Sequence, residues 1–187
     1  FQVFPTEAKS PPLKTPVLIA DSSGKTSAWL ASLGVKTLPW DGEAASGAVL
    51  VVGRQTLSGT AGNRPKLSAL EDFVTAGGRL LVMSQDADWT RETTGFRVTH
   101  HSTRRMWPVQ AAHPLMAGVP VSALRDWAGG STLQEARPAY PLNEFPPHGW
   151  RWGQRGVLGA AAIEKPHFTG WRPIFESEFD LQYTPLM

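Results

Sequence analysis

The chain has 187 residues, of which 41% are hydrophobic and 18% charged, and its formal net charge is +2. This composition is typical of a globular domain and excludes the disordered and membrane-spanning classes. Because Lys and Arg are scattered along the sequence, we expect no nucleic-acid partner. Because apolar stretches such as Ala48–Val52 and Leu80–Met83 are too short to cross a bilayer, we expect no membrane partner either.

The first sixteen residues are rich in proline. They contain Pro5, Pro11, Pro12 and Pro16, which predicts an extended linker that follows another part of a longer polypeptide. We expect residues 17–187 to form a single domain.

The first half of the sequence alternates apolar runs with amphipathic segments. One helix is expected after Asp21, ending at Gly34. A second is expected with Asn63 as N-cap and Pro65 in its first turn, ending at Gly77. Buried strands are predicted at Val17–Ala20, Val35–Trp40, Ala48–Val52 and Arg79–Met83.

This alternation predicts an α/β fold with a doubly wound, mostly parallel sheet and helices on both faces. From about Asp88 onward, the many Pro, Gly and Trp residues predict long irregular insertions. In that half we expect strands only near Gly156–Ile163 and Pro173–Leu181.

In an open α/β sheet the ligand crevice lies beyond the carboxyl ends of the strands. Three loops are expected to meet there, after the first, third and fourth predicted strands. Their candidate site residues are Asp21, Ser23, Gly24, Lys25, Thr26, Arg54, Gln55, Ser84, Gln85 and Asp86.

Two segments at this edge resemble catalytic motifs without matching them. Ser23-Gly24-Lys25-Thr26 suggests a phosphate loop, but Ile19 stands where a Walker A loop needs glycine, so a helix-capping turn is favoured. Ser84 follows a strand but lacks the flanking glycines of a nucleophile elbow. An ordinary strand-end hydroxyl is therefore the better interpretation.

Histidines and carboxylates offer further candidates for chemistry. The five histidines lack a recognised metal-binding spacing, and His113 is expected to cap a helix or turn locally, so we predict no metal and no cofactor. Glu176, Glu178 and Asp180 alternate in a predicted strand. They form either a glycosidase-like acid/base group or the solvated face of a sheet that buries Phe175.

Five tryptophans concentrate aromatic surface in the second half. Such rings pack in the core, anchor a neighbouring domain or stack on sugars, and all three roles stay open. The residues are Trp107, Trp127, Trp150, Trp152 and Trp171.

Several segments together resemble the class I glutamine amidotransferase-like superfamily, which has a flavodoxin-like fold. Generic to that fold are Asp21–Thr26, Leu33–Val35, Val51–Arg54 and Ala76–Val82. More specific segments resemble the amidotransferase-like domains appended to bacterial glycoside hydrolases of the family 2 and β-galactosidase type. These are His113–Gly118, Leu124–Trp127, Ser131–Leu133, Ile163–Pro166 and Phe179–Leu186.

The resemblance implies a scaffold without the family's chemistry. The family places a Cys at the strand-to-helix elbow and a His-Glu pair late in the domain. This chain offers Ser84 or Gln85 at the elbow and has no His-x-Glu in its last thirty residues. Because no thiolate can form, glutamine hydrolysis is not expected.

By analogy we expect a non-catalytic module that supports domain packing or self-association in a larger carbohydrate-active enzyme. The alternatives are a carbohydrate-binding module that uses the tryptophans, and a free-standing hydrolase centred on Ser84 or the Glu/Asp row. The resemblance favours export to the periplasm or the extracellular space. Since related domains continue beyond Thr184-Pro-Leu into another strand, we expect the chain to be truncated at its C-terminus.

Overall fold

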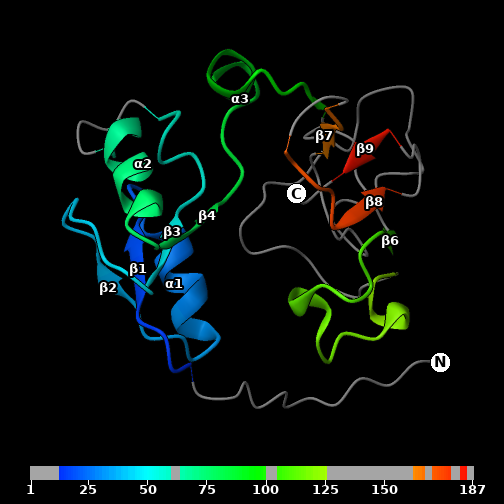
Figure 1. Ribbon diagram of the computed structural model, residues 1–187, viewed down its shortest axis with the longest axis horizontal. Coiled ribbons are helices and arrows are strands. Elements are labelled where there is room, and N and C mark those ends of the chain that lie inside the picture. Colours follow the sequence, from blue (N-terminus) through cyan, green and yellow to red (C-terminus); the bar gives the residue numbers. More distant parts are fainter. Residues whose placement is uncertain are drawn as a thin grey trace, which may run out of the picture. The chain divides into compact units, whose positions relative to one another are not determined.

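The structure is a computed structural model that describes residues 13–59, 64–99, 105–125, 162–166, 170–177 and 182–184. The chain divides into two compact units, Phe1–Asp86 and Ala87–Met187, which we call the first and second units. Figure 1 shows the elements of each. Residues 1–12 of the predicted linker lie outside the described residues.

The first unit is built on a parallel sheet. Its strands are β1 (Val17–Ala20), β2 (Leu38–Pro39), β3 (Val49–Val52) and β4 (Arg79–Val82), in the order β2-β1-β3-β4. Every neighbouring pair is parallel. Mixed α/β structure with a parallel sheet in the first half is thus confirmed.

Helix α1 (Lys25–Ser32) covers one face of this sheet. Its Leu30 packs with Ile19 of β1 and Val51 of β3 in a single cluster. Since side chains alternate along a strand, Leu50 and Val52 point to the opposite face. Both are fully buried as well, so the sheet has an apolar interior on each side.

Helix α2 (Leu67–Thr75) buries Leu70 and Phe73 and contacts β4. The Phe73 ring is fully buried and meets Trp40 edge to face, with ring centroids 6.1 Å apart. A Cβ at Gly78 would lie 2.2 Å from Cε1 of this ring. Glycine is therefore required at position 78 to let the backbone pass under the ring.

Three local predictions for the first unit need correction. Of the strand expected at Val35–Trp40, only Leu38–Pro39 forms a strand, β2. Val35 instead packs against the apolar cluster that contains Leu30 of α1. Helix α2 begins at Leu67 with Lys66 as N-cap in extended conformation, so Pro65 precedes the helix instead of standing in its first turn. Asn63 lies outside the described residues.

The third correction concerns β4, which was expected to be buried. Leu81 and Val82 are 42% and 43% exposed. In the part of the chain that the structure describes, β4 pairs only with β3 and ends the sheet. Apolar residues at such a position are covered only on their inner side, which a hydrophobic run in the sequence does not reveal.

The second unit has short elements. They are α3 (Ala87–Thr94), β5 (Val98–Thr99), β6 (Met106–Pro108), the 3-10 turns η1 (Pro114–Met116) and η2 (Val121–Ala123), β7 (Ala162–Glu164), β8 (Phe175–Ser177) and β9 (Tyr183–Thr184).

Its strands form two antiparallel groups, β5-β7-β9 and β6-β8. Parallel pairing therefore does not extend to the described strands of this half. Met106 of β6 forms a small core with Met116 and Leu124, and Phe175 of β8 packs against it. Among the helices of the described ranges, none has the length and apolar character needed to cross a bilayer.

Candidate functional site

The first strand-end loop is organised by the Asp21 carboxylate. Oδ2 accepts hydrogen bonds from Ser27 N at 2.8 Å and Ser27 Oγ at 3.1 Å. Oδ1 accepts from Ser23 N and Ser23 Oγ. The carboxylate therefore caps the N-terminus of α1, where the helix dipole favours a negative charge.

These contacts determine the protonation of Asp21. Partial burial by itself raises its pKa, but the hydrogen bonds from Ser27 and Ser23 outweigh that effect and hold the pKa below its ordinary value of 3.8. Because an internal carboxylate occupies the start of α1, the Ser23–Thr26 turn is a capping turn, as the sequence favoured over a phosphate loop.

The second loop is joined to the first by two buried threonines. Thr26 Oγ1 accepts a hydrogen bond from Arg54 N at 3.1 Å, and Thr56 Oγ1 accepts one from Ser22 N at 3.2 Å. At Gly53 a Cβ would lie 2.7 Å from Asp21 Oδ1. Glycine at 53 is thus what lets the two loops approach.

The third loop contributes Gln85, whose side-chain amide ties it to the second. Its Oε1 accepts hydrogen bonds from Leu57 N at 2.8 Å and Ser58 N at 3.4 Å. Its Nε2 donates to the carbonyl oxygens of Gly53 and Met83. The sequence placed Gln85 in a ligand crevice, but its amide makes four hydrogen bonds that join backbone segments of the chain. We call the three joined loops the strand-end joint.

The other candidate residues lie around this joint. Gly24 is the N-cap of α1 and adopts φ 70°, and Lys25 is exposed at the first position of the helix. Asp86 N donates to Ser58 Oγ at 2.9 Å. Ser84 is exposed, and its carbonyl oxygen accepts from Gln55 N at 3.0 Å.

Gln55 has a φ of 56°, which costs energy for a residue with a Cβ. The hydrogen bond to Ser84 and the bond from Gly59 N to the Gln55 carbonyl hold this conformation. The sequence offered no signal for it, nor for the cross-link through Thr56, because isolated polar residues in loops have no periodicity.

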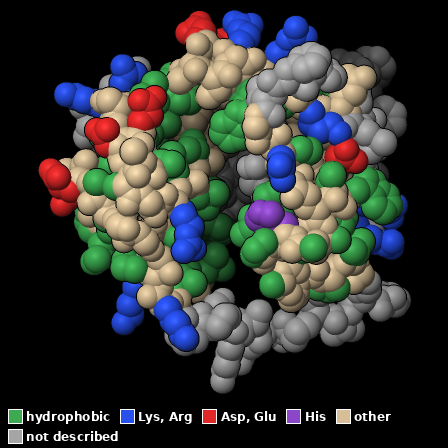
Figure 2. Space-filling model, viewed as in Figure 1, with side chains coloured by type: hydrophobic (Ala, Val, Ile, Leu, Met, Phe, Trp, Pro, Cys, Tyr) green, Lys and Arg blue, Asp and Glu red, His purple; other side chains and the backbone are tan. Residues whose placement is uncertain are grey.

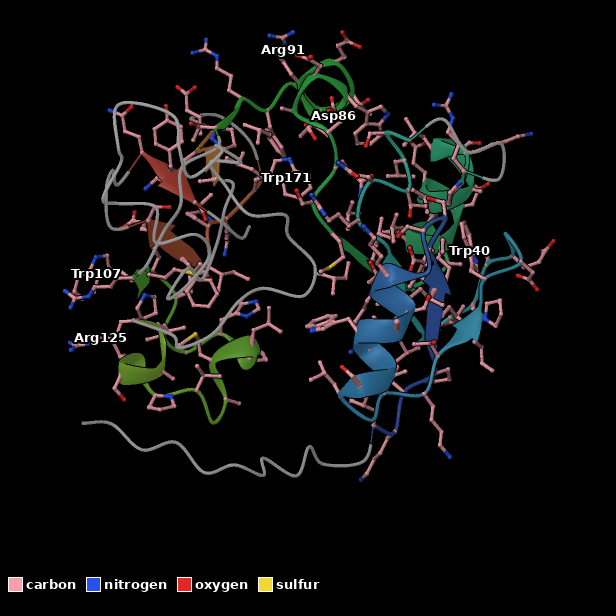
Figure 3. All side chains as sticks on the ribbon, turned by 180° about the vertical axis from the view of Figure 1, so that it is seen from behind. Trp40, Asp86, Arg91, Trp107, Arg125 and Trp171 are labelled. Atoms are coloured by element: carbon pink, nitrogen blue, oxygen red, sulfur yellow. The ribbon has the colours of Figure 1, made fainter. Side chains whose placement is uncertain are left out.

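The second unit carries two of the candidate tryptophans. Trp107 is 43% exposed and lies under the Arg105 guanidinium, 5.2 Å from the ring centroid. Trp171 is 54% exposed and meets Phe96 edge to face. Figure 3 shows the two rings in separate places. Trp127, Trp150 and Trp152 lie outside the described residues.

Of the candidate acidic row, Glu176 is described, and it pairs with Lys165. Both side chains are about three-quarters buried. The Lys165 ammonium thus holds the Glu176 carboxylate in an ion pair. The register of β6 and β8 places Glu176 opposite Trp107. Glu178 and Asp180 lie outside the described residues.

His113 caps the η1 turn. Its Nδ1 accepts a hydrogen bond from Leu115 N at 3.2 Å, which confirms the local capping role predicted for this residue. Among the residues described by the structure, no three His, Cys, Asp or Glu side chains gather in a way that could hold a metal ion.

Comparisons with protein-family models, with curated proteins and with solved structures find no match to this chain. The functional argument therefore depends on the geometry of the two units and on the sequence.

Proposed function

We propose that this chain is a non-catalytic accessory module of a larger carbohydrate-active enzyme, of the β-galactosidase-like type. In this proposal the first unit is a doubly wound, flavodoxin-like scaffold of the class I amidotransferase-like kind. Its role is to support domain packing or self-association rather than to catalyse a reaction.

The strand-end joint is the observation that carries the proposal. In catalytic α/β domains this edge presents side chains to a ligand. Here Asp21, Thr26, Thr56 and Gln85 direct their polar atoms at neighbouring backbone and hydroxyl groups. Groups engaged in this way stabilise the loops and are not available to bind or activate a substrate.

The elbow position supports the same conclusion. An activated nucleophile needs a base within hydrogen-bond reach. Residues 1–86 include neither histidine nor cysteine. The amide of Gln85, next to Ser84, is engaged in hydrogen bonds to the backbone. This favours an inert scaffold over a hydrolase centred on Ser84.

The strand order supports the proposed scaffold. Doubly wound flavodoxin-like sheets run 2-1-3-4-5, and the first unit has β2-β1-β3-β4. Buried apolar residues on both faces of β3 agree with coverage by helices on each side.

Activity assays on the purified chain test the proposal. We expect no hydrolysis of glutamine or of aryl glycosides above the rate in buffer, with Ser84→Ala and Glu176→Gln proteins as controls. Hydrolysis at enzyme-like rates that is lost in either variant would refute the proposal. The natural reading frame gives a second test, since we expect it to encode a catalytic domain as well.

A further inference from the structure

The two edge strands of the first sheet differ in what they offer to a further strand. Figure 1 shows β2 at one edge and β4 at the other. Directly after β2, Trp40 N donates to the Ile19 carbonyl oxygen at 2.9 Å, so Trp40 faces β1. Since backbone groups alternate along a strand, Pro39 faces away from the sheet, and proline has no N–H. The outer edge of β2 therefore has no donor for a further strand at this position.

The outer edge of β4 keeps its donors and acceptors. Arg79 N and Met83 N each donate to a carbonyl oxygen on the β3 side, at 2.9 and 3.0 Å. By the same alternation, the N–H and C=O groups of Leu80 and Val82 point away from β3. In the part of the chain that the structure describes, no strand pairs with them. Because backbone groups of a strand need hydrogen-bond partners, this edge is able to accept another strand.

The side chains of β4 suit such pairing as well. Leu81 and Val82 are exposed, although both are apolar. In Figure 2, hydrophobic side chains lie around the position that β4 has in Figure 1, and the acidic side chains of the first unit lie away from it. Edge strands usually avoid pairing through proline, charge or a bulge. Apart from Arg79 at its start, β4 has neither proline nor charge.

We propose that two copies of this chain pair through β4 in antiparallel fashion and form a two-fold symmetric dimer. A closed dimer uses the same surface on both copies, and two identical strand edges match in this way when they run antiparallel. The inference rests on the proposed role in self-association and names its partner and its contact. Because the outer edge of β2 lacks a donor at Pro39, the sheet is not extended there and assembly ends at the dimer.

The register of the dimer follows from the direction of the backbone groups. Hydrogen-bonded residues of an antiparallel pair exchange both of their bonds, so Leu80 of one copy faces Val82 of the other. Leu81 lies between them and points its backbone groups at β3. The two-fold axis therefore passes at Leu81, which faces the same residue of the second copy.

The charges agree with this register. Arg79 is the charged residue of β4, and it faces Met83 of the second copy. The two arginines are then about 13 Å apart along the paired strands, which is longer than the screening length of about 8 Å at physiological salt. Apolar side chains meet at the positions between them. No like charges are thus placed opposite each other.

Analytical ultracentrifugation of the full 187-residue chain tests the inference. We expect the average mass to rise from that of a monomer toward that of a dimer as the concentration increases through the micromolar range. In hydrogen exchange followed by NMR, the N–H groups of Leu80 and Val82 should become protected as the dimer forms. Their protection in a monomer would show that another segment of the same polypeptide covers the edge, which would overturn the inference.

A charge swap at the axis tests the register. Because Leu81 faces itself, Leu81→Lys and Leu81→Glu each place like charges opposite each other and should weaken the dimer about tenfold or more. An equimolar mixture of the two variants should restore association, because opposite charges then meet. Val74→Lys is the matched control. Val74 is similarly exposed but lies on α2, so this variant should dimerise like the wild-type chain.

Val82→Pro tests the hydrogen bonds of the dimer. Because Val82 N points away from β3, proline removes a donor to the second copy and none to β3. We expect the dimer to be lost while the far-ultraviolet circular dichroism stays that of the wild-type chain. If the Leu81 variants do not fold, Val82→Pro still decides the matter.

Four results would overturn the inference: a monomer at every concentration, an unimpaired dimer in Leu81→Lys, no association in the mixture, or an equal loss in Val74→Lys. A chain that stays monomeric would refute this inference alone, because a module that packs against other domains of its own polypeptide needs no second copy. Hydrolysis of glutamine or of an aryl glycoside would refute the proposed non-catalytic role alone.

Discussion

The two units of this chain use their polar side chains in different ways. In the first unit, the Asp21 carboxylate accepts a hydrogen bond from Ser27 N at the start of α1, and the Gln85 amide bonds to the backbone of a neighbouring loop. In the second unit, charged groups lie in ion pairs, such as Arg97 with Glu164 at 3.2 Å, or stack on an exposed ring, as Arg105 does on Trp107. Inward polar groups hold a scaffold together, whereas outward ones can meet a partner.

This difference makes the stability of the first unit sensitive to single contacts. Cross-links between buried backbone groups leave donors and acceptors without partners when they are removed. Exposed ion pairs contribute little, because water and salt screen them. Three substitutions test the comparison, each with a counterpart in the second unit.

The largest effect is expected for Gly78→Ala in the first unit. The new Cβ would meet the buried Phe73 ring, whose nearest atom lies 2.2 Å away. We expect the free energy of unfolding to fall by about 3 kcal/mol, as for other overpacked cores. Urea denaturation measures the change.

Gly170→Ala is the matched control, because a Cβ there meets no atom of the described residues within 4 Å. It should change stability by less than about 0.5 kcal/mol. Equal effects of the two substitutions would show that the Phe73 contact is not tight in solution.

A smaller loss is expected for Gln85→Ala. The change removes the bonds to Leu57 N and to the carbonyl oxygens of Gly53 and Met83. Since these groups are partly buried, we expect a loss of about 2 kcal/mol. Thermal unfolding followed by circular dichroism gives the value.

Its counterpart is Gln110→Ala in the second unit, where the amide makes one bond among the described residues, to the Pro173 carbonyl at 2.9 Å. We expect about 1 kcal/mol there. A Gln110 variant as unstable as the Gln85 variant would remove the contrast between the units.

The smallest of the three effects is expected for Asp21→Asn, at about 1 kcal/mol near neutral pH. Because the folded pKa of Asp21 lies below its ordinary value of 3.8, its stabilising contribution is complete above the unfolded value. It is lost as the pH falls through the folded value. The variant should therefore show a flatter loss of stability in acid than the wild-type chain.

The control is Asp88→Asn, which alters an exposed ion pair with Arg91 in the second unit. Because exposed ion pairs contribute little, it should change the free energy of unfolding near neutral pH by less than about 0.5 kcal/mol. If Asp21→Asn loses stability in acid as steeply as the wild-type chain, the cap does not depend on the charge of Asp21.

Local patterns account for the predictions that were confirmed. Val17–Ala20 and Val49–Val52 are uninterrupted apolar runs, which suit strands buried on both faces. Leu70 and Phe73 of α2 are three residues apart, which is helical spacing, and both are buried. His113 is followed by Pro114, and its capping role depends only on residues next to it.

The candidate site was predicted only in its location. The sequence placed Asp21, Gln85 and their neighbours at the strand ends but could not show that they bond to one another. Those contacts join residues about thirty positions apart, and the pairing depends on how closely the loops approach. The Arg105–Trp107 contact was missed for a related reason, because two nearby residues share a face only once the strand is known.

The sequence by itself determined the parallel α/β character of the first unit and, through the absence of cysteine, excluded thiol chemistry. Both follow from residue type and short-range periodicity. Only the tertiary structure decided that the strand-end residues form a joint and that Trp107 lies among charged groups on an outer face. Hydrogen bonds and exposure depend on which distant backbone segments meet, and no short stretch of sequence contains that information.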